Sequence, residues 1–192
     1  MRKLFKVGLV ASGVGALVYW QLQRWFTEEP RYEVERKVHG VEIRHYPAIV
    51  RAETLIDDDK ADAAVNQAFR RLAGYIFGAN ATRSKIAMSA PVTQASVVTF
   101  TMPRGRTLAD LPAPRDPRVR LRSAPPRRVA VLRYSGRTTP DRVREKELVL
   151  RAALAREGLV ATGEVVSARY DPPSTLPLLR RNEVWLDLAP AS

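Results

Sequence analysis

Residues 168–188 read ARYDPPSTLPLLRRNEVWLDL, and this stretch decides how the rest of the chain is arranged. A strand-like run ends at Tyr170, because proline has no backbone N–H and fixes φ, so a paired strand cannot continue through residues 172–173. After a loop that Pro177 interrupts again, apolar residues alternate over 183–188 in the pattern of a new strand. The stretch therefore predicts two neighbouring strands joined by a rigid, proline-braced loop.

The second half of the chain reads as strand, helix, strand, strand. Residues 129–134 have a strand pattern, and the helix that follows opens with Thr139-Pro140-Asp141 as its N-cap and first turn. Gly158 ends this helix, and the strands at 165–170 and 183–188 complete the unit. Because its apolar residues follow one face only, the helix is expected to cover a sheet.

The first half repeats this order. Its helix carries apolar residues at helical spacing from Val65 to Ile76 and is stopped by Gly78 and Asn80. The strands expected in this half are 32–38, 41–46, 48–55, 85–92 and 97–102. The doubled strand–helix–strand–strand unit predicts an α+β fold with a pseudo-twofold arrangement, in which two helices flank an antiparallel sheet. A ligand cleft is expected between a helix and the sheet.

The first residues have a composition different from the rest. A basic start is followed by residues 7–20, which carry no charge but are shorter than the roughly 20 residues that cross a bilayer squarely. Aromatic residues follow this run where a signal-peptidase site needs small ones, which favours an uncleaved membrane anchor over a cleaved signal or a buried helix. We predict an anchor or signal at 1–26, a linker at 27–31 and a domain at 32–189. The positive-inside rule then puts the domain on the periplasmic side of a bacterial inner membrane.

Composition excludes several classes of site. The chain has 192 residues and no cysteine, so disulfides, thiolate metal sites and covalent haem attachment through thioethers are ruled out. The net charge is +12, mostly from scattered arginine. The densest basic run, 115–128, is interrupted by three prolines and carries no aromatic residue on which a base could stack, so nucleic acid is not an expected partner.

Four motifs, in order, resemble the SOUL haem-binding protein family. They are VEIRHY at 41–46, LAGYIFGAN at 72–80, KIAMSAPV at 85–92, and YDPP at 170–173 followed by RNEVW at 181–185. Together they extend over most of residues 32–188. The resemblance implies a distorted antiparallel β-barrel with two flanking helices, in agreement with the repeat. It also implies non-covalent tetrapyrrole binding rather than catalysis.

The resemblance also implies where haem would bind. His45 matches a histidine proposed as an axial iron ligand in some members, although a strand histidine is more often a hydrogen-bonded structural residue. The family's pocket lies over its first helix, at the positions of Asn66, Phe69 and Ala73. Some members carry a methionine and a lysine where this chain has Ala73-Gly74, which leaves the expected pocket smaller in side chains and weaker in charge.

Two further residues, Arg70 and Met88, complete the expected set. Arg70 and its neighbour Arg71 are candidates for the propionates, with solvated surface arginines as the alternative. Met88 either packs in the core or offers its thioether to iron. The second histidine, His39, precedes Gly40 and is expected in a solvated turn.

Catalytic signatures are absent from the sequence: it has no HExxH, G-x-S-x-G or P-loop motif. We therefore expect a membrane-tethered binding protein, not an enzyme, that buffers or carries haem or a related tetrapyrrole reversibly. The alternative is a GyrI-like effector-binding domain for another apolar or cationic ligand, with possible hydrolase activity through a buried carboxylate. A buried glutamate in the cleft favours that alternative, and an open apolar cleft rimmed by arginine favours a tetrapyrrole.

Overall fold

The computed structural model describes residues 27–57 and 62–189. In chain order its elements are β1 (Glu33–Val38), β2 (Val41–Tyr46), β3 (Ile49–Leu55), α2 (Asp62–Ile76), β4 (Val92–Gln94), β5 (Val97–Thr101), β6 (Arg120–Ala124), β7 (Arg127–Tyr134), α3 (Pro140–Arg156), β8 (Ala161–Arg169), a 3-10 turn η1 (Pro177–Leu179) and β9 (Asn182–Leu188). The strands form one antiparallel sheet in the order β1-β2-β7-β9-β8-β4-β5-β3-β6.

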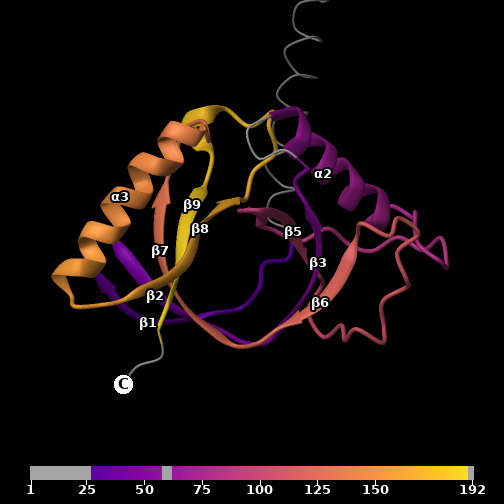
Figure 1. Cartoon of the computed structure of the whole chain (residues 1–192), viewed down its shortest axis with the longest axis horizontal. Coiled ribbons are helices and arrows are strands. Elements are labelled where there is room, and N and C mark those ends of the chain that lie inside the picture. Colours follow the sequence, from indigo (N-terminus) through magenta and orange to yellow (C-terminus); the bar gives the residue numbers. More distant parts are fainter. Residues whose placement is uncertain (1–26, 58–61, 190–192) are drawn as a thin grey trace, which may run out of the picture.

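The strand order contains the predicted repeat. The unit β3-α2-β4-β5 corresponds to β7-α3-β8-β9, and the two units meet where β4 pairs with β8. On either side of that pair the order is mirrored, with β6 next to β3 in one half and β2 next to β7 in the other. Figure 1 shows α2 beside the half that contains β3 and β5, and α3 beside β7, β8 and β9.

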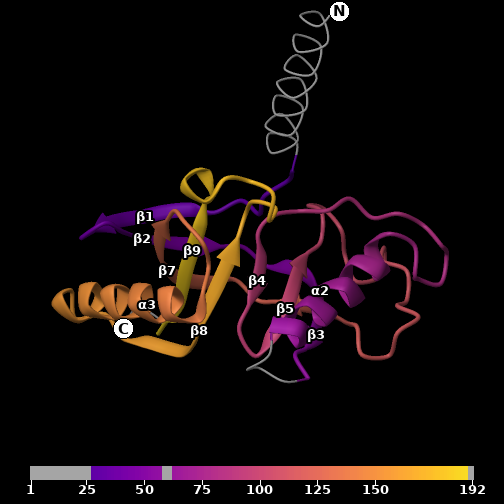
Figure 2. The same ribbon diagram turned by 90° about the horizontal axis from the view of Figure 1, so that it is seen from above.

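The sheet curls but does not close. Instead of the expected distorted barrel, the described residues form an open half-barrel with β1 and β6 at its edges (Figures 1 and 2). Both edge strands are rich in charged residues, and most of their side chains are exposed. Charged edge strands resist pairing with further strands, which accounts for the open sheet.

The expected strand over 85–92 is wrong. Only its last residue belongs to a strand, β4, because the segment before it is bound to the end of α2. Asn80 donates its side-chain amide to the carbonyl oxygens of Tyr75 (2.9 Å) and Ser84 (2.8 Å), and the Ile86 N–H donates to Ile76 (2.8 Å). Strand β6 was not expected, since its sequence RLRSA has little of the apolar alternation that marks a strand.

The helices begin and end as expected. Thr139 caps α3 by accepting a hydrogen bond from the Arg142 N–H (3.3 Å), and Gly158 follows the helix with a φ of 64°. One face of α3 packs on β2, β7 and β9 through a cluster around Ile43, Leu150 and Leu186. Helix α2 packs on its own half in a second cluster.

The predicted anchor or signal, residues 1–26, lies outside the described residues. Within the described part of the chain, neither helix is long and apolar enough to cross a membrane. Residues 27–31, the predicted linker, lie against the domain. The Glu28 carbonyl oxygen accepts a hydrogen bond from the Ala90 N–H (2.8 Å), and the Glu29 carboxylate binds Arg181 (3.0 and 3.1 Å).

Candidate functional site

A row of aromatic rings lies on the face of the sheet away from α3. Successive residues of a strand point to opposite faces, so Ile43 of β2 packs under α3 while Tyr46 joins Trp185 of β9 on the other face. The ring centroids of Tyr32 and Tyr46 are 5.3 Å apart, and those of Tyr46 and Trp185 are also 5.3 Å apart. We call Tyr32, Tyr46 and Trp185 the aromatic row.

Glu183 lies next to the aromatic row, and its side chain is fully buried. Its carboxylate accepts two hydrogen bonds from Arg44 (3.0 and 3.2 Å) and two from Arg181 (3.1 and 2.9 Å). The Tyr170 hydroxyl (2.7 Å) and the Trp185 indole N–H (2.8 Å) donate two more. Every acceptor position of the carboxylate is therefore occupied by the protein itself.

The charges around Glu183 keep it ionised. Burial alone would raise the pKa of its carboxyl, but hydrogen bonds and charge from Arg44, together with Arg181, outweigh burial and hold that pKa below its ordinary value of 4.5. Burial and the charge of Glu183 raise the pKa of Tyr170, so its hydroxyl stays protonated and donates. The guanidinium of Arg44 also lies 4.1 Å from the centre of the Tyr32 ring, which ties the aromatic row to this cluster.

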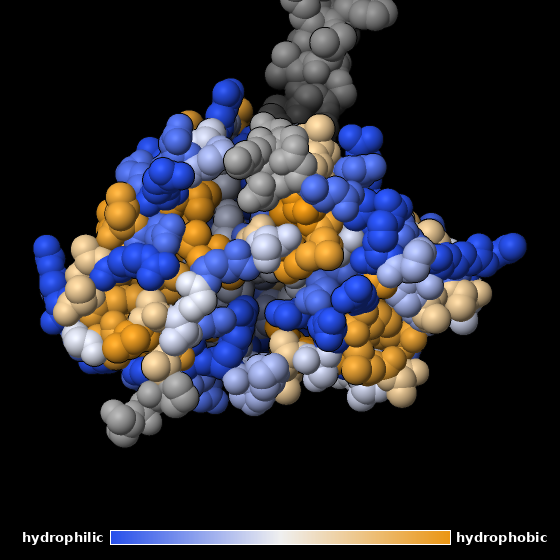
Figure 3. Space-filling view, viewed as in Figure 1, coloured by the Kyte–Doolittle hydropathy of each residue, from blue (hydrophilic) through white to orange (hydrophobic). Residues whose placement is uncertain are grey.

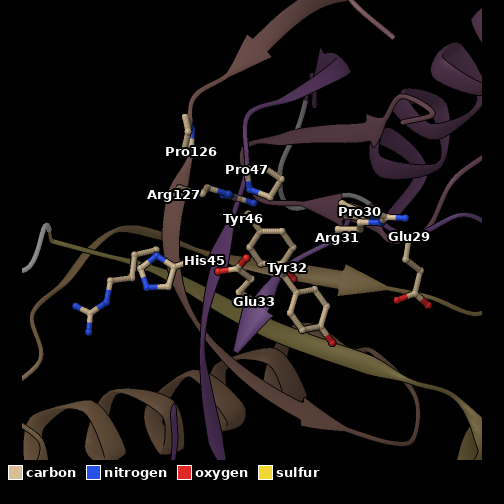
Figure 4. Close-up of a pocket in the computed structure, with 11 residues that line it drawn as sticks. Glu29, Pro30, Arg31, Tyr32, Glu33, His45, Tyr46, Pro47, Pro126 and Arg127 are labelled. Carbon is tan, nitrogen blue, oxygen red and sulfur yellow. The ribbon is translucent and has the colours of Figure 1, made fainter. Parts of the chain in front are cut away.

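An open hollow of about 810 Å³ lies beside Tyr32 and Tyr46, the two members of the aromatic row that line it. It is lined by residues 29–33, the end of β2 with Pro47, and the start of β7 with Pro126. Figure 4 shows the rings of Tyr32 and Tyr46 side by side, with Arg31 beyond one end and Arg127 along the margin. The Arg127 guanidinium lies 5.5 Å from the centre of the Trp185 ring. The hollow thus combines an aromatic wall with a rim that carries several arginines and two glutamates, Glu29 and Glu33.

His45 also lines the hollow, but its imidazole belongs to the opposite face of the sheet. Figure 4 shows His45 and Tyr46 on opposite sides of the β2 ribbon. The imidazole is half exposed, and its Nε2 lies 2.8 Å from Glu35 Oε2. The same carboxylate accepts two hydrogen bonds from Arg128, both of 2.7 Å. His45 is therefore held at the margin of the hollow and does not face the aromatic row.

The contribution of Glu35 to the stability of the fold is expected to depend on pH. The hydrogen bonds from Arg128, with a smaller contribution from His45, lower the pKa of Glu35 from 4.5 to about 2. A lowered carboxyl pKa stabilises the fold above pH 4.5, and this stabilisation disappears as the pH falls toward 2. For a solvent-accessible pair we expect Glu35→Gln to cost about 1 kcal/mol at pH 7.

Urea unfolding of the parent chain and Glu35→Gln between pH 7 and about pH 3 measures this contribution. The two stability curves should approach each other below pH 4.5. A difference that stays constant down to pH 3 contradicts the role assigned to Glu35.

The expected residues on α2 form a separate, exposed stripe. Asn66, Phe69, Arg70 and Ala73 follow one another at helical spacing, and Phe69 is 38% exposed while its ring packs edge-on against Phe100 (5.3 Å). Figure 3 shows apolar residues at the surface on the α2 side of the molecule, among hydrophilic ones. Helix α2 packs on β3 and β5, whereas His45 is on β2 in the other half. The structure thus places His45 and the α2 stripe on different halves.

Two other expectations change with the structure. Met88 is 39% exposed in the segment before β4, so it does not pack in the core. The Arg71 guanidinium is bound to Thr54 (2.9 Å) and Asp57 (3.0 Å), which leaves Arg70 as the exposed arginine of this pair.

The sequence patterns did not identify the aromatic row or the residues bound to Glu183 as parts of one site. One signal was present. In β2 Arg44 and Tyr46 share one face of the strand, and in β9 Glu183 and Trp185 share one face and alternate with apolar residues. A charged residue and an aromatic residue on the same face of two strands indicate a partly polar, enclosed face.

Solved structures of low sequence identity share the fold. The C-terminal domain of EcmrR superposes with a TM-score of 0.52 at 9% identity, covering 82% of this chain and 98% of that one. A hydrolase from Listeria innocua gives a TM-score of 0.50 at 13% identity, covering 88% of this chain and 97% of that one. At such identities the likeness concerns the fold alone.

Sequence relatives are nearer. Heme-binding protein 2 of Mus musculus is 30% identical over 166 residues, which is 80% of each chain. Heme-binding protein 2 of Homo sapiens is 31% identical over 158 residues, or 76% of each. Residues 27–187 match the family described as SOUL heme-binding protein, over the same region that holds the repeat, the aromatic row and the Glu183 cluster. The chain therefore belongs to the SOUL heme-binding protein family.

Proposed function

We propose that this protein binds haem or a related tetrapyrrole non-covalently and reversibly, in the hollow beside Tyr32 and Tyr46. Family membership supports a tetrapyrrole as the ligand class. The observation that supports this location is the aromatic wall bordered by arginine in a hollow of about 810 Å³. That volume lies within the roughly 300–1,000 Å³ of sites for small ligands and cofactors.

The residues present suit the ligand. A tetrapyrrole has a flat apolar ring that stacks on aromatic side chains. The partly exposed ring of Tyr32 offers such a surface, and the buried ring of Tyr46 packs against it. Its propionates need cations, which Arg31 and Arg127 supply at the rim. When bound, haem supplies a redox-active iron, and the residues named here bind and orient its ring.

The absence of cysteine and the open hollow both support non-covalent, reversible binding. A covalent thioether link to haem needs cysteine thiols, and an open site allows the ligand to leave without a large rearrangement. Reversible binding is what a buffering or carrier role requires. We place that role at the membrane, with residues 1–26 as the tether and the domain on the periplasmic side.

The alternative based on a buried carboxylate receives less support. A buried glutamate is present, but Glu183 is held by two guanidinium groups, a phenol and an indole. A carboxylate in this state neither takes up a proton near neutral pH nor attracts a cationic ligand. We therefore do not propose a hydrolytic role for Glu183.

A charge-reversal pair distinguishes the hollow from the α2 stripe. Arg31 and Arg70 are both exposed, so Arg31→Glu and Arg70→Glu make the same change of charge at little structural cost. We expect Arg31→Glu to weaken haemin binding about tenfold, because one charge-assisted contact contributes about 1.5 kcal/mol. Arg70→Glu should bind like the parent chain.

The measurement is a titration of the full chain with haemin, followed at the Soret band. The reverse result, with Arg70→Glu weakened and Arg31→Glu unchanged, would move the site to the α2 stripe. A parent chain with no saturable binding would refute tetrapyrrole binding altogether.

A further inference from the structure

The loop between β8 and β9 exposes three leucines. Leu176 is 57% exposed, Leu178 72% and Leu179 47%, and all three lie within or next to the 3-10 turn η1. Burying a leucine is worth about 1.5–3 kcal/mol, so three neighbouring leucines with side chains this exposed form a substantial apolar surface. We call Leu176, Leu178 and Leu179 the leucine loop.

The leucine loop is braced from within, so its exposure is built into the fold. Arg180 donates from Nε to the Thr175 carbonyl oxygen (2.8 Å) and from its terminal nitrogen to the Pro173 carbonyl oxygen. The Pro177 carbonyl oxygen accepts a hydrogen bond from the Gly136 N–H of the turn before α3 (2.9 Å). These bonds fix the backbone of the loop in the conformation in which the three leucines are exposed.

The described chain begins beside this loop. Arg181, two residues after Leu179, binds the carboxylate of Glu29 (3.0 and 3.1 Å), and Thr27 is two residues before Glu29. Figure 2 shows the β8–β9 loop and the segment that leads into β1 on the same side of the molecule. Two residues span at most about 7 Å, so the start of the described chain and the leucine loop lie close together.

The length of chain before Thr27 limits how far the uncharged run can lie from this side. Residues 21–26 separate that run, which ends at Trp20, from the described part. Six residues span at most about 20 Å even when fully extended. A bilayer that holds the uncharged run would therefore lie next to the side that carries the leucine loop.

The charge near the loop suits an anionic surface. Arg137 is exposed in the turn that is hydrogen-bonded to Pro177, and Arg180 directly follows Leu179. Arg31 is exposed two residues after Glu29. The acidic side chains nearest in the chain are engaged, with Glu29 bound to Arg181 and Asp171 accepting from the Arg181 N–H (2.6 Å). Arginine near an anionic bilayer is attracted by its surface potential.

We propose that the leucine loop inserts into the headgroup region of an anionic phospholipid bilayer and fixes the domain against it. This proposal rests on the membrane tether put forward above. Because residues 29–31 line the hollow and lie beside the loop, the insertion would hold the ligand site next to the bilayer surface.

The natural absence of cysteine allows a direct test with the full chain. Leu178→Cys places one thiol on the loop, and Val160→Cys places one on an equally exposed apolar residue (66%). Val160 precedes Ala161, which pairs with Leu188 at the end of the β8–β9 pair far from the loop. Each thiol is labelled with an environment-sensitive fluorophore, and the protein is reconstituted into phosphatidylcholine vesicles with about 30% phosphatidylglycerol and lipid-borne nitroxide quenchers.

We expect the label at residue 178 to shift to the blue and to lose roughly half its fluorescence or more to the quenchers, while the label at 160 is unchanged. Flotation of the same vesicles measures whether the proposed tether holds the protein on the membrane. A chain that floats while both labels remain in water overturns the loop proposal and leaves the tether standing. A chain that does not float overturns the tether and the loop contact with it. A blue shift at 178 that grows with protein concentration without lipid assigns the loop to contacts between copies, against the proposal.

Discussion

Replacing Glu183 by Gln is expected to lower the free energy of unfolding by about 3–5 kcal/mol. The substitution keeps the shape of the side chain but removes its charge. Arg44, of which only 3% is exposed, and Arg181 then keep buried positive charges that have lost their shared partner. Each guanidinium keeps one carboxylate nearer the surface, Glu42 for Arg44 (2.8 Å) and Glu29 for Arg181 (3.0 Å). The buried cluster nevertheless loses its central negative charge, and neither guanidinium can regain its hydration there.

Urea unfolding of the full chain at pH 7 measures this effect, with Glu145→Gln as the matched control. Glu145 is exposed on α3 and pairs with Lys146 (2.7 Å), so removing its charge should leave the free energy of unfolding nearly unchanged. Equal and small effects of the two substitutions would show that Glu183 is not the electrostatic centre of the sheet.

The second large effect is on ligand binding. Tyr32→Ala is expected to weaken haemin binding about a hundredfold, because it removes roughly 100 Å² of apolar contact together with an aromatic stacking partner, or about 2.5–3 kcal/mol. Tyr32 is well suited to this test because it lies before β1 and contacts the sheet through Arg44 and Tyr46, so the strand pairing remains.

Tyr32→Phe is the matched control, since it keeps the ring and loses only the hydroxyl, and it should bind like the parent chain. The same titration with His45→Ala tests the predicted axial ligand. The imidazole is bound to Glu35 on the other face of β2, so we expect an unchanged Soret maximum. A shifted maximum in His45→Ala, with His39→Ala unchanged, would instead show that His45 reaches the iron. Parent-like affinity in Tyr32→Ala would remove the aromatic row from the site.

Local sequence patterns were sufficient to predict a helix or strand where its hydrogen bonds are local or its apolar face is continuous. The Thr139 cap, the stop at Gly158 and the proline break after Tyr170 each follow from backbone chemistry within a few residues. The repeat could be read because both units use the same alternation and the same helical spacing. The expectation for 85–92 failed because a strand-like composition was tied to the end of α2 by Asn80, a contact that alternation does not encode.

The candidate site shows the same limit. The resemblance named His45 and the α2 residues together, but β2 and α2 belong to different halves of the sheet, and only the folded chain shows that. The separation of His45 from Tyr46, in contrast, follows from the sequence, because neighbouring residues of a strand point to opposite faces.

By itself the sequence determined the two-unit plan, the helix ends, the proline-braced loop and the family. Each of these depends on residues that are neighbours in the chain or on motifs in a fixed order. Only the tertiary structure decided that the sheet stays open and that Tyr32 and Tyr46 of the aromatic row line one hollow. It also brought Arg44 to Glu183 across 139 residues of chain. The physical reason is that burial and charge pairing act through space, so a carboxylate's partners are set by strand register rather than by sequence distance.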